Sequence, residues 1–257
     1  MIAAIVQARM GSIRLPGKVL KKVVGKPLLE HIVERLKKSK KLEKIIVATT
    51  SEPADKPIIE LCKRNSIDYF IGSENDVLDR YYQAAKKFRA DSIVRITADC
   101  PLIDPVVVDK ILDYFLQNRG KLDFASNTLK RTYPDGLDVE VFSFETLERA
   151  WSEAKNSFDR EHVTPFICNN PDKFRVANVE NDRDLSGLRW TVDYPEDFEM
   201  VRLVFENLYQ KKGVFLMDDV IKLLKKKPEI AKINKGIVGK NNLKISKAIK
   251  EGRSVTR

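Results

Sequence analysis

Short runs of Ile, Val and Ala alternate with segments of helical periodicity along residues 1–116. The apolar runs are bounded by turn residues and lie at residues 2–6, 45–48, 69–71 and 92–96. The periodic segments span residues 26–38, 56–64, 75–88 and 105–116. Strands that are apolar on both faces are typical of a parallel sheet covered by helices on each side. The alternation therefore predicts an α/β fold with a doubly wound, mostly parallel sheet.

A different pattern follows Asp123. Residues 137–142 alternate apolar and charged side chains after a Tyr-Pro-Asp-Gly turn, which predicts a strand in a small β segment that caps the sheet. The remaining elements are predicted as helices at 144–154, around 160–168 and at 195–208, and a short strand at 190–192. A Lys-rich, helical stretch starts at Met217. We divide the chain into an α/β domain at 1–210 and a basic helical extension at 211–257.

The net charge of +10 comes from this C-terminal extension. Residues 211–257 contain 14 Lys and Arg against 4 Asp and Glu, so the preceding part of the chain is balanced. A basic stretch on a neutral domain most often forms a solvated helical surface, and nucleic acid is not the favoured partner. Because no apolar run reaches the length of a membrane span and the N-terminus lacks a signal-peptide pattern, we expect a cytoplasmic protein without a membrane partner.

Cysteine and histidine are too few for a disulfide framework or a zinc site. The chain has three cysteines without a Cys-x-x-Cys pair, and two histidines. Any bound metal should therefore be held mainly by oxygen.

A loop rich in glycine and basic residues follows the first strand. Residues 8–18 read Ala-Arg-Met-Gly-Ser-Ile-Arg-Leu-Pro-Gly-Lys and include the cations Arg9, Arg14 and Lys18. Glycines let backbone N–H groups approach an anion, cations neutralise a triphosphate, and α/β sheets bind ligands at the carboxyl ends of their strands. The spacing is not that of the ATPase loop, because no Ser or Thr follows the lysine. The pattern favours a phosphate-binding loop over a basic surface turn.

This loop, with Gly-Lys-Pro-Leu at residues 25–28, resembles the signature of the cytidylyltransferases that activate acidic sugars, the acylneuraminate and 3-deoxy-manno-octulosonate cytidylyltransferase family. The resemblance is greatest to the spore coat polysaccharide biosynthesis protein F subfamily. It extends over most of residues 2–208 through the motifs VATT (47–50), GSENDVLDRY (72–81), DCPLID (99–104), YPDGLDVEVF (133–142), REHVTP (160–165) and RWTVDYPEDFE (189–199).

The resemblance implies a Rossmann-like nucleotidyltransferase fold and a reaction of CTP with an acidic sugar that yields a CMP-sugar and pyrophosphate, for surface polysaccharide or glycan biosynthesis. It also implies Mg²⁺ and a homodimer, for which the strand at 137–142 could supply contacts. In this reaction a sugar hydroxyl attacks the α-phosphorus of CTP. Lys18, Arg9 and Arg14 are the expected catalytic cations, since they would neutralise charge on the phosphates.

Two carboxylates are candidate metal ligands. Asp99 follows the strand at 92–96 and Asp193 follows the strand at 190–192, so both are expected at the carboxyl edge of the sheet. Two carboxylates together with phosphate oxygens suit Mg²⁺, and the resemblance implies the same role. The alternative for Asp193 is a carboxylate that accepts hydrogen bonds from the first N–H groups of the helix at 195–208.

The other site residues are implied mainly by the resemblance. The nucleotide would contact Ala8, Arg9, Gly11, Ser12, Arg14, Lys18, Thr49, Ser73 and Arg80. Arg80 lies on a helix with an apolar stripe, so a solvated surface cation is its alternative. The acceptor sugar would contact Arg160, His162 and Asp135, with Arg131 as a second cation for its carboxylate. The alternatives are a hydrogen-bonded structural role for His162 and a turn-forming role for Asp135.

Two other classes of function are kept as alternatives. A glycosyltransferase of related fold would use an Asp-x-Asp motif, and residues 182–184 read Asp-Arg-Asp, although a surface turn is the better interpretation. A non-catalytic nucleotide- or RNA-binding protein would use the basic extension, and would lose salt-sensitive RNA affinity when that extension is removed.

Overall fold

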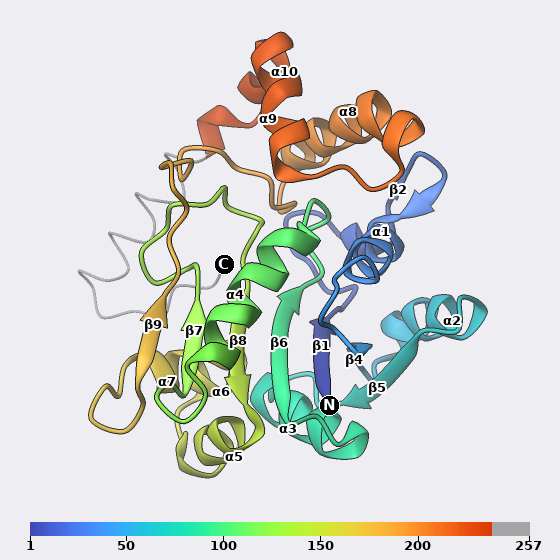
Figure 1. The fold of residues 1–257 in the computed structure, drawn as a ribbon. Helices are drawn as coiled ribbons and strands as arrows, with labels where there is room; N and C mark the ends of the chain where they lie inside the picture. The colour runs from blue at the N-terminus through green and yellow to red at the C-terminus, as the bar shows by residue number, and fades with distance from the viewer. Residues whose placement is uncertain (238–257) are drawn as a thin grey trace.

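The computed structural model describes residues 1–237 and contains a sheet of seven strands in the order β5-β4-β1-β6-β8-β7-β9 (Figure 1). Four neighbouring strands are parallel: β1 (Ile2–Gln7), β4 (Lys44–Thr50), β5 (Asp68–Gly72) and β6 (Ser92–Thr97). The chain moves outward from β1 to β4 and β5, then returns to the other side of β1 as β6. This reversal confirms the predicted doubly wound arrangement.

The segment after Asp123 extends this sheet instead of lying over it. β8 (Glu140–Ser143) pairs antiparallel with β6, β7 (Phe124–Ser126) pairs antiparallel with β8, and β9 (Val176–Asn178) pairs parallel with β7. The strand predicted at 137–142 begins only at Glu140. Before that residue, the main-chain groups of Leu137 and Val139 form hydrogen bonds with the side chains of Asn127 and Ser126 and within the preceding turn. β7 and β9 have three residues each, too short for a periodic signal.

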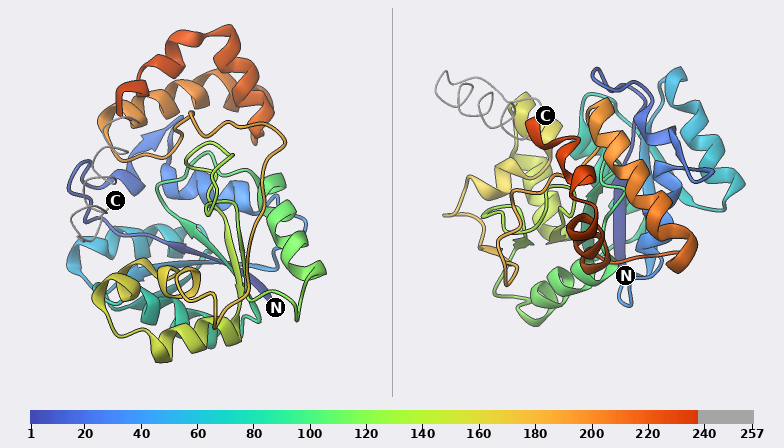
Figure 2. Two further views of the ribbon diagram at one scale, coloured as in Figure 1. Left: turned by 90° about the vertical axis from the view of Figure 1, so that its left-hand side faces the viewer. Right: turned by 90° about the horizontal axis from the view of Figure 1, so that it is seen from above.

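Alternate residues of the strands support two separate apolar layers. Ala4 and Val6 of β1 face the layer with α1 (Leu28–Leu36), α2 (Lys56–Arg64) and α4 (Pro105–Gln117). Ala3 and Ile5 face the layer with α3 (Val77–Phe88), α5 (Phe144–Glu153) and α7 (Pro165–Cys168). Figure 2 shows the sheet between these two groups of helices. Both faces of the central strands are therefore buried, which explains their continuous apolar sequence.

The C-terminal helices lie beyond the carboxyl ends of the parallel strands (Figure 1). They are α8 (Pro195–Lys212), α9 (Met217–Lys226) and α10 (Pro228–Lys232). Phe215, Val220 and Ile230 are buried in the same apolar cluster as α1 and α4. The expected boundary at residue 211 thus falls within α8, and residues 238–257 of the predicted extension lie outside the described residues.

Three predicted helix limits are corrected by local contacts. α1 starts at Leu28 and not at residue 26, because β3 (Lys26–Pro27) pairs with β2 (Lys22–Val23). α3 starts at Val77, after Asp76 accepts the N–H of Asp79 at 2.9 Å. The helix predicted around 160–168 is two helices, α6 (Ser157–His162) and α7, since the backbone of Val163 has a positive φ of 74°. Two short 3₁₀ turns complete the chain, at Lys18–Leu20 and Pro53–Asp55.

Among the described residues, no helix combines the length and apolar character needed to cross a membrane.

Candidate active site

The candidate site lies at the carboxyl edge of the parallel strands, where the strand order reverses between β1 and β6. The loop of residues 8–18 leaves β1 at this point, Asp99 follows β6, and Ser73 follows β5. In an open α/β sheet the two crossovers leave in opposite directions at such a reversal, which opens a crevice for a ligand. The topology therefore brings these predicted segments to one edge.

The loop folds back on itself through backbone contacts. Asp55 Oδ1 accepts the N–H of Met10 at 2.7 Å, and the N–H of Gly17 donates to the carbonyl of Met10 at 3.2 Å. Gly17 has a φ of +67°, and a Cβ there would lie 3.1 Å from Met10 Cε. Glycine thus allows the turn that directs Lys18 toward the sheet edge, while Ile13 at the tip of the loop is 96% exposed.

Lys18 contacts two carboxylates from distant parts of the chain. Its Nζ lies 3.1 Å from Asp99 Oδ2 and 2.8 Å from Asp193 Oδ1, and it donates to the carbonyl of Val192 at 2.8 Å. Burial alone would lower the pKa of Lys18, but the charges of Asp99 and Asp193 outweigh it and hold this pKa above the usual value. Lys18 is therefore a fully charged ammonium at neutral pH.

Asp99 is held ionised by the same cluster. Its Oδ1 accepts the hydroxyl of Thr97 at 2.5 Å. Burial opposes ionisation, yet the charge of Lys18 and the hydrogen bonds from Thr97 and Lys18 keep the pKa of Asp99 below its usual value. The neighbouring Cys100 is 3% exposed, and burial raises the pKa of its thiol, which indicates a packing residue.

Asp193 reaches this cluster along a segment that is neither helix nor strand. The N–H of Val192 donates to the carbonyl of Asp99 at 2.7 Å, whereas the N–H groups of Trp190 and Thr191 donate to the carbonyl of Asp135. The strand predicted at 190–192 is therefore wrong: this segment bridges two loops and follows neither of them in register. The outcome for Asp193 is nevertheless the expected position beside Asp99.

The helix-capping alternative for Asp193 is also wrong. Asp193 Oδ1 accepts a hydrogen bond from Lys18 Nζ and lies 3.2 Å from Arg14 Nη2 in an ion pair, and Oδ2 accepts a hydrogen bond from Arg189 Nη2 at 3.0 Å. Asp197 instead caps α8, since its Oδ2 accepts the N–H groups of Asp193 and Tyr194, both at 3.1 Å. The side chain of Asp193 is thus directed to the cations and away from the helix.

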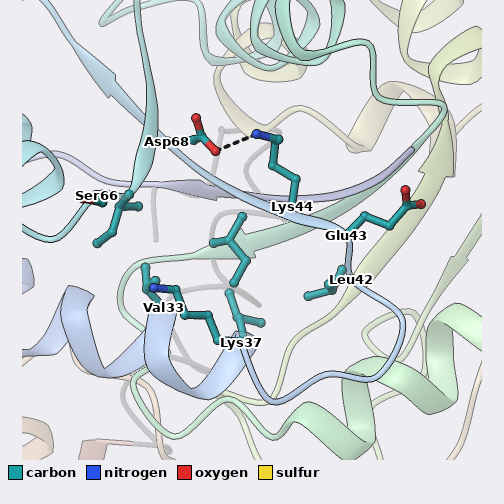
Figure 3. A pocket seen from close by; sticks show the side chains of 10 residues that line it. Val33, Lys37, Leu42, Glu43, Lys44, Ser66 and Asp68 are labelled. Atoms are coloured by element: carbon teal, nitrogen blue, oxygen red, sulfur yellow. Dashed lines mark hydrogen bonds and ion pairs between the residues drawn. The ribbon is translucent and has the colours of Figure 1, made fainter.

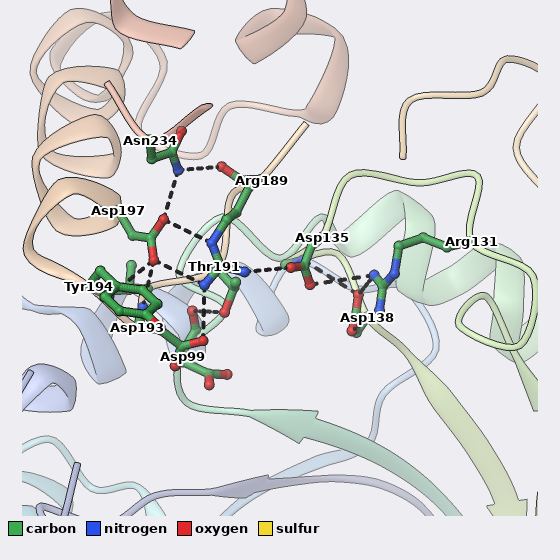
Figure 4. Close-up of polar contacts among 12 residues, drawn as sticks. Asp99, Arg131, Asp135, Asp138, Arg189, Thr191, Asp193, Tyr194, Asp197 and Asn234 are labelled. Atoms are coloured by element: carbon green, nitrogen blue, oxygen red, sulfur yellow. Dashed lines mark hydrogen bonds and ion pairs between the residues drawn. The ribbon is translucent and has the colours of Figure 1, made fainter. Parts of the chain in front are cut away.

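Arg189 links Asp193 to a second group of charges (Figure 4). Its Nε and Nη2 donate to the two oxygens of the fully buried Asp197 at 3.0 Å, and Nη1 donates to Asp135 at 2.8 Å. Asp135 also lies 3.6 Å from Arg131, which binds Asp138 through both terminal nitrogens. The sequence did not identify Arg189 or Asp197, because their contacts depend on the tertiary path of residues 190–192, which form neither helix nor strand.

The predicted nucleotide residues gather at the ends of β1, β4 and β5. Arg80 is 2% exposed and donates to the carbonyl of Ser73 at 2.7 Å, so the surface-cation alternative is wrong. Burial lowers the pKa of Arg80, and the positive charge of the nearby, exposed Arg9 lowers it further. The hydroxyl of Thr49 is buried and has no hydrogen-bond partner within residues 1–237, and Ala8 is also buried. These groups remain predicted nucleotide contacts.

Gly11 and Ser12 lie in the loop itself, where Gly11 has open space around its Cα and Ser12 Oγ accepts the N–H of Leu15 at 3.3 Å. Neither contacts Lys18 in an observed hydrogen bond, and both stay predictions for the phosphates.

Arg160 and His162 belong to α6, and Arg160 contacts the start of α3. Arg160 Nε and Nη2 bind Asp76 Oδ2 at 2.9 and 2.6 Å, and Nη1 donates to the carbonyl of Trp151. The ring of His162 packs edge-on against Phe158 at 4.5 Å. Both arginines expected to bind a sugar carboxylate, Arg160 and Arg131, are thus paired with carboxylates of the chain.

The donor set at Asp99 and Asp193 fits a hard divalent cation. Both carboxylates contact the same ammonium, so their oxygens converge on a point that already holds a positive charge. Within residues 1–237, no cluster of three or more His, Cys, Asp or Glu side chains is arranged to bind a metal. Two carboxylates completed by water and substrate phosphate are the usual environment of Mg²⁺.

Two other features lie outside this site. The hollow in Figure 3 lies beside the amino end of β4, at the edge of the sheet opposite the candidate site. Its lining includes Val33, Lys37 and Lys44. The Asp-Arg-Asp sequence at 182–184 forms a surface turn in which Asp182 is 96% exposed. This agrees with the preferred interpretation of that motif and gives no support to a glycosyltransferase.

Comparison with known proteins identifies a match along almost the whole chain. A family model described as cytidylyltransferase matches residues 3–245. An uncharacterized protein of Methanocaldococcus jannaschii is 43% identical over 92% of this chain and 95% of its own length. The spore coat polysaccharide biosynthesis protein SpsF of Bacillus subtilis is 30% identical over 90% of this chain and 96% of its own.

Solved structures agree with these relatives. A cytidylyltransferase from Leptospira borgpetersenii is 39% identical and superposes with a TM-score of 0.86, covering 90% of this chain and 96% of that one. A CMP:2-keto-3-deoxy-manno-octonic acid synthetase complexed with CTP has a TM-score of 0.60 at 19% identity, covering 80% and 98%, which shows a shared fold.

Proposed function

Because this chain belongs to the cytidylyltransferase family, we propose that its CTP-dependent reaction transfers CMP to an acidic sugar and releases pyrophosphate. The observation that carries the proposal is Lys18, held by Asp99 and Asp193 at the strand-order reversal. The acidic class of the acceptor comes from a relative, a 3-deoxy-manno-octulosonate cytidylyltransferase of Trichlorobacter lovleyi, which is 34% identical over 46% of each chain. The spore coat polysaccharide relative supports a role in polysaccharide biosynthesis.

The loop cations would bind the triphosphate. Lys18 and Arg14 lie together beside Asp193, and Arg14 Nε is a buried donor without a partner among the described residues. A sugar hydroxyl attacks the α-phosphorus of CTP, the bond from this phosphorus to the bridging oxygen breaks, pyrophosphate leaves, and the hydroxyl proton is released. Lys18, Arg14 and Arg9 stabilise the charge that develops on the leaving phosphates, so the reaction needs no covalent enzyme intermediate.

Asp99 and Asp193 would hold Mg²⁺ together with phosphate oxygens. The ion supplies charge neutralisation at the phosphates when it is bound. The Thr97 hydroxyl fixes Asp99 and Arg189 fixes Asp193, so both carboxylates stay directed toward the position that Lys18 Nζ occupies.

The nucleoside would lie against the ends of β4 and β5. The buried hydroxyl of Thr49, which has no hydrogen-bond partner among the described residues, offers a hydrogen bond to a base edge. Arg80 is held against Ser73, and a Cβ at Gly72 would lie 2.9 Å from Arg80 Cγ, so glycine permits this close approach. Ala8 adds a small side chain at the end of β1.

The acceptor sugar would lie on the Asp135 side of the cluster. Carboxylates there can accept hydrogen bonds from sugar hydroxyls, and Arg131 could exchange Asp138 for the carboxylate of the substrate. Arg160 and His162 would contribute from α6, and two copies of the chain would form the active enzyme. These assignments are part of the proposal.

The test combines nucleotide binding with turnover. We expect CTP with Mg²⁺ to raise the melting temperature more than ATP, GTP or UTP, because a ligand at 100 times its dissociation constant adds about 2.7 kcal/mol of stability. Pyrophosphate release is then measured with acidic sugars and with the matched neutral sugars, with and without EDTA. A preference for another nucleotide, or equal turnover of neutral sugars, would overturn the proposal.

A further inference from the structure

Asn234, in the C-terminal region, contacts the charged cluster formed by Arg189, Asp193 and Asp197. Asn234 lies two residues beyond the end of α10 and is 3% exposed. Its Nδ2 donates to Asp197 Oδ1 at 2.8 Å and to the carbonyl of Arg189 at 2.9 Å (Figure 4). One side-chain amide therefore contacts both partners that hold Asp193.

We propose that Asn234 is a positioning residue for the active site, acting through Asp197 and Arg189 on Asp193. This inference rests on the proposed cytidylyl transfer. If this proposal holds, the end of the described C-terminal region contributes to the geometry of the active site.

The contacts of Asp197 explain how a distant amide can act on Asp193. Asp197 is completely buried, and its oxygens accept donors from Arg189, Asn234 and the main chain of Asp193 and Tyr194. Oδ1 receives two of these donors, from Arg189 Nε and Asn234 Nδ2. Because a buried carboxylate must keep its hydrogen bonds, loss of Asn234 should pull Asp197 and Arg189 from their present positions.

Arg189 passes such a shift on to the reacting groups. Its Nη2 donates to both Asp197 Oδ2 and Asp193 Oδ2, at 3.0 Å each. Asp193 in turn binds Lys18 and Arg14 of the phosphate loop. Asn234 itself contacts neither Lys18 nor Asp193 in an observed hydrogen bond, so its effect must be transmitted through the buried pair.

The positioning role depends on the N–H groups that the Asn234 amide donates, and not on the size of its side chain. Asn234→Asp keeps the shape but turns an oxygen toward the Arg189 carbonyl and the Asp197 carboxylate, whereas Asn234→Ala removes the donor and leaves space. If Asn234 only filled space, the Asp variant would resemble the parent. If it donates as described, the Asp variant is affected at least as strongly as the Ala variant.

The experiment measures kcat and KM for CTP per folded enzyme, well below the melting temperature of each variant. We expect both variants to lose about tenfold to a hundredfold in kcat, as small misplacements of reacting groups do, while KM for CTP changes by less than about threefold. Asn234→Ser, which keeps one hydroxyl donor on a shorter side chain, should lose about threefold to tenfold in kcat. The exposed neighbour Lys235 gives the control, and Lys235→Ala should match the parent.

The outcomes separate the two proposals. A parent without CTP-dependent pyrophosphate release contradicts the proposed function itself. An active parent, with Asn234→Asp equal to it in kcat, overturns the positioning role of Asn234. A lower melting temperature with unchanged kcat in both variants would also overturn it. If the Asp and Ala variants do not fold, Asn234→Ser decides, since a kcat within about twofold of the parent contradicts the role.

Discussion

Replacing Lys18 by methionine removes the ammonium between Asp99 and Asp193 while keeping a long apolar stem. In the parent, Nζ contacts the two carboxylates at 3.1 and 2.8 Å and the carbonyl of Val192 at 2.8 Å. The variant therefore loses the cation nearest to both candidate metal ligands. If Lys18 also binds the phosphates of CTP, the same change removes a charge that stabilises the transition state.

The expected losses in activity and in stability differ in size. Removal of one preorganised transition-state donor costs about 10²–10³ in kcat, or about 2.7–4 kcal/mol. Breaking a fully buried ion pair would cost about 3–5 kcal/mol of folding stability. Here the cost should be smaller, about 1–3 kcal/mol, because Asp193 keeps Arg14 and Arg189, and Asp99 is 28% exposed and keeps the Thr97 hydroxyl.

Pyrophosphate release with CTP and the best acidic sugar measures kcat, and urea denaturation measures the free energy of unfolding. Lys22, exposed and four residues further along, provides the matched control: Lys22→Met should change neither quantity appreciably. A folded Lys18→Met variant that keeps kcat within about threefold of the parent would refute the placement of Lys18 at the phosphates.

Further variants test the rest of the cluster. Arg189→Met should lower the free energy of unfolding by about 3–5 kcal/mol, because it leaves the buried Asp197 without a cation; a loss under about 1 kcal/mol in urea would contradict this. The lowered pKa of Asp99 stabilises the fold above its unfolded pKa, near 3.8, and this contribution disappears as pH falls through the lower folded pKa. Denaturation between about pH 2 and 5 should thus show a shallower acid slope in Lys18→Met than in the parent. Thr49→Val should leave the unliganded protein as stable as before and weaken CTP binding about fivefold by calorimetry, whereas unchanged affinity would remove Thr49 from the nucleotide site.

The sequence predicted those parts of the fold that depend on local pattern. The helix at 56–64 was predicted with its observed limits, and the strands of the parallel half within a few residues, because hydrophobic periodicity is a property of neighbouring side chains. β7 and β9 could not be predicted, since three residues that owe their conformation to pairing with distant strands carry no period. The prediction of a single helix around residue 163 was wrong because the positive φ of Val163 interrupts the helix, and hydrophobic periodicity does not reveal such a backbone conformation.

The candidate site divides in the same way. The placement of the phosphate-loop residues and Asp99 at the sheet edge was predicted because each segment follows a predictable strand, and parallel strands end at one edge. Arg189 and Asp197 were missed, although the spacing Arg189-Asp193-Asp197 is regular. That spacing indicates contact only in a helix, and residues 189–193 are not helical, so only the tertiary structure shows that these side chains meet.

The charges of the site are compensated before any substrate is present. Lys18 forms ion pairs with Asp99 and Asp193, which are distant from it in sequence, and Arg189 forms an ion pair with Asp197 at the start of α8. Such pairing avoids the cost of burying an unpaired charge at the sheet edge. A triphosphate that binds Lys18 and Arg14 must compete with these carboxylates, which then need another positive charge. If CTP and a divalent cation bind here as proposed, we therefore expect each to strengthen the binding of the other, and either one alone to bind more weakly.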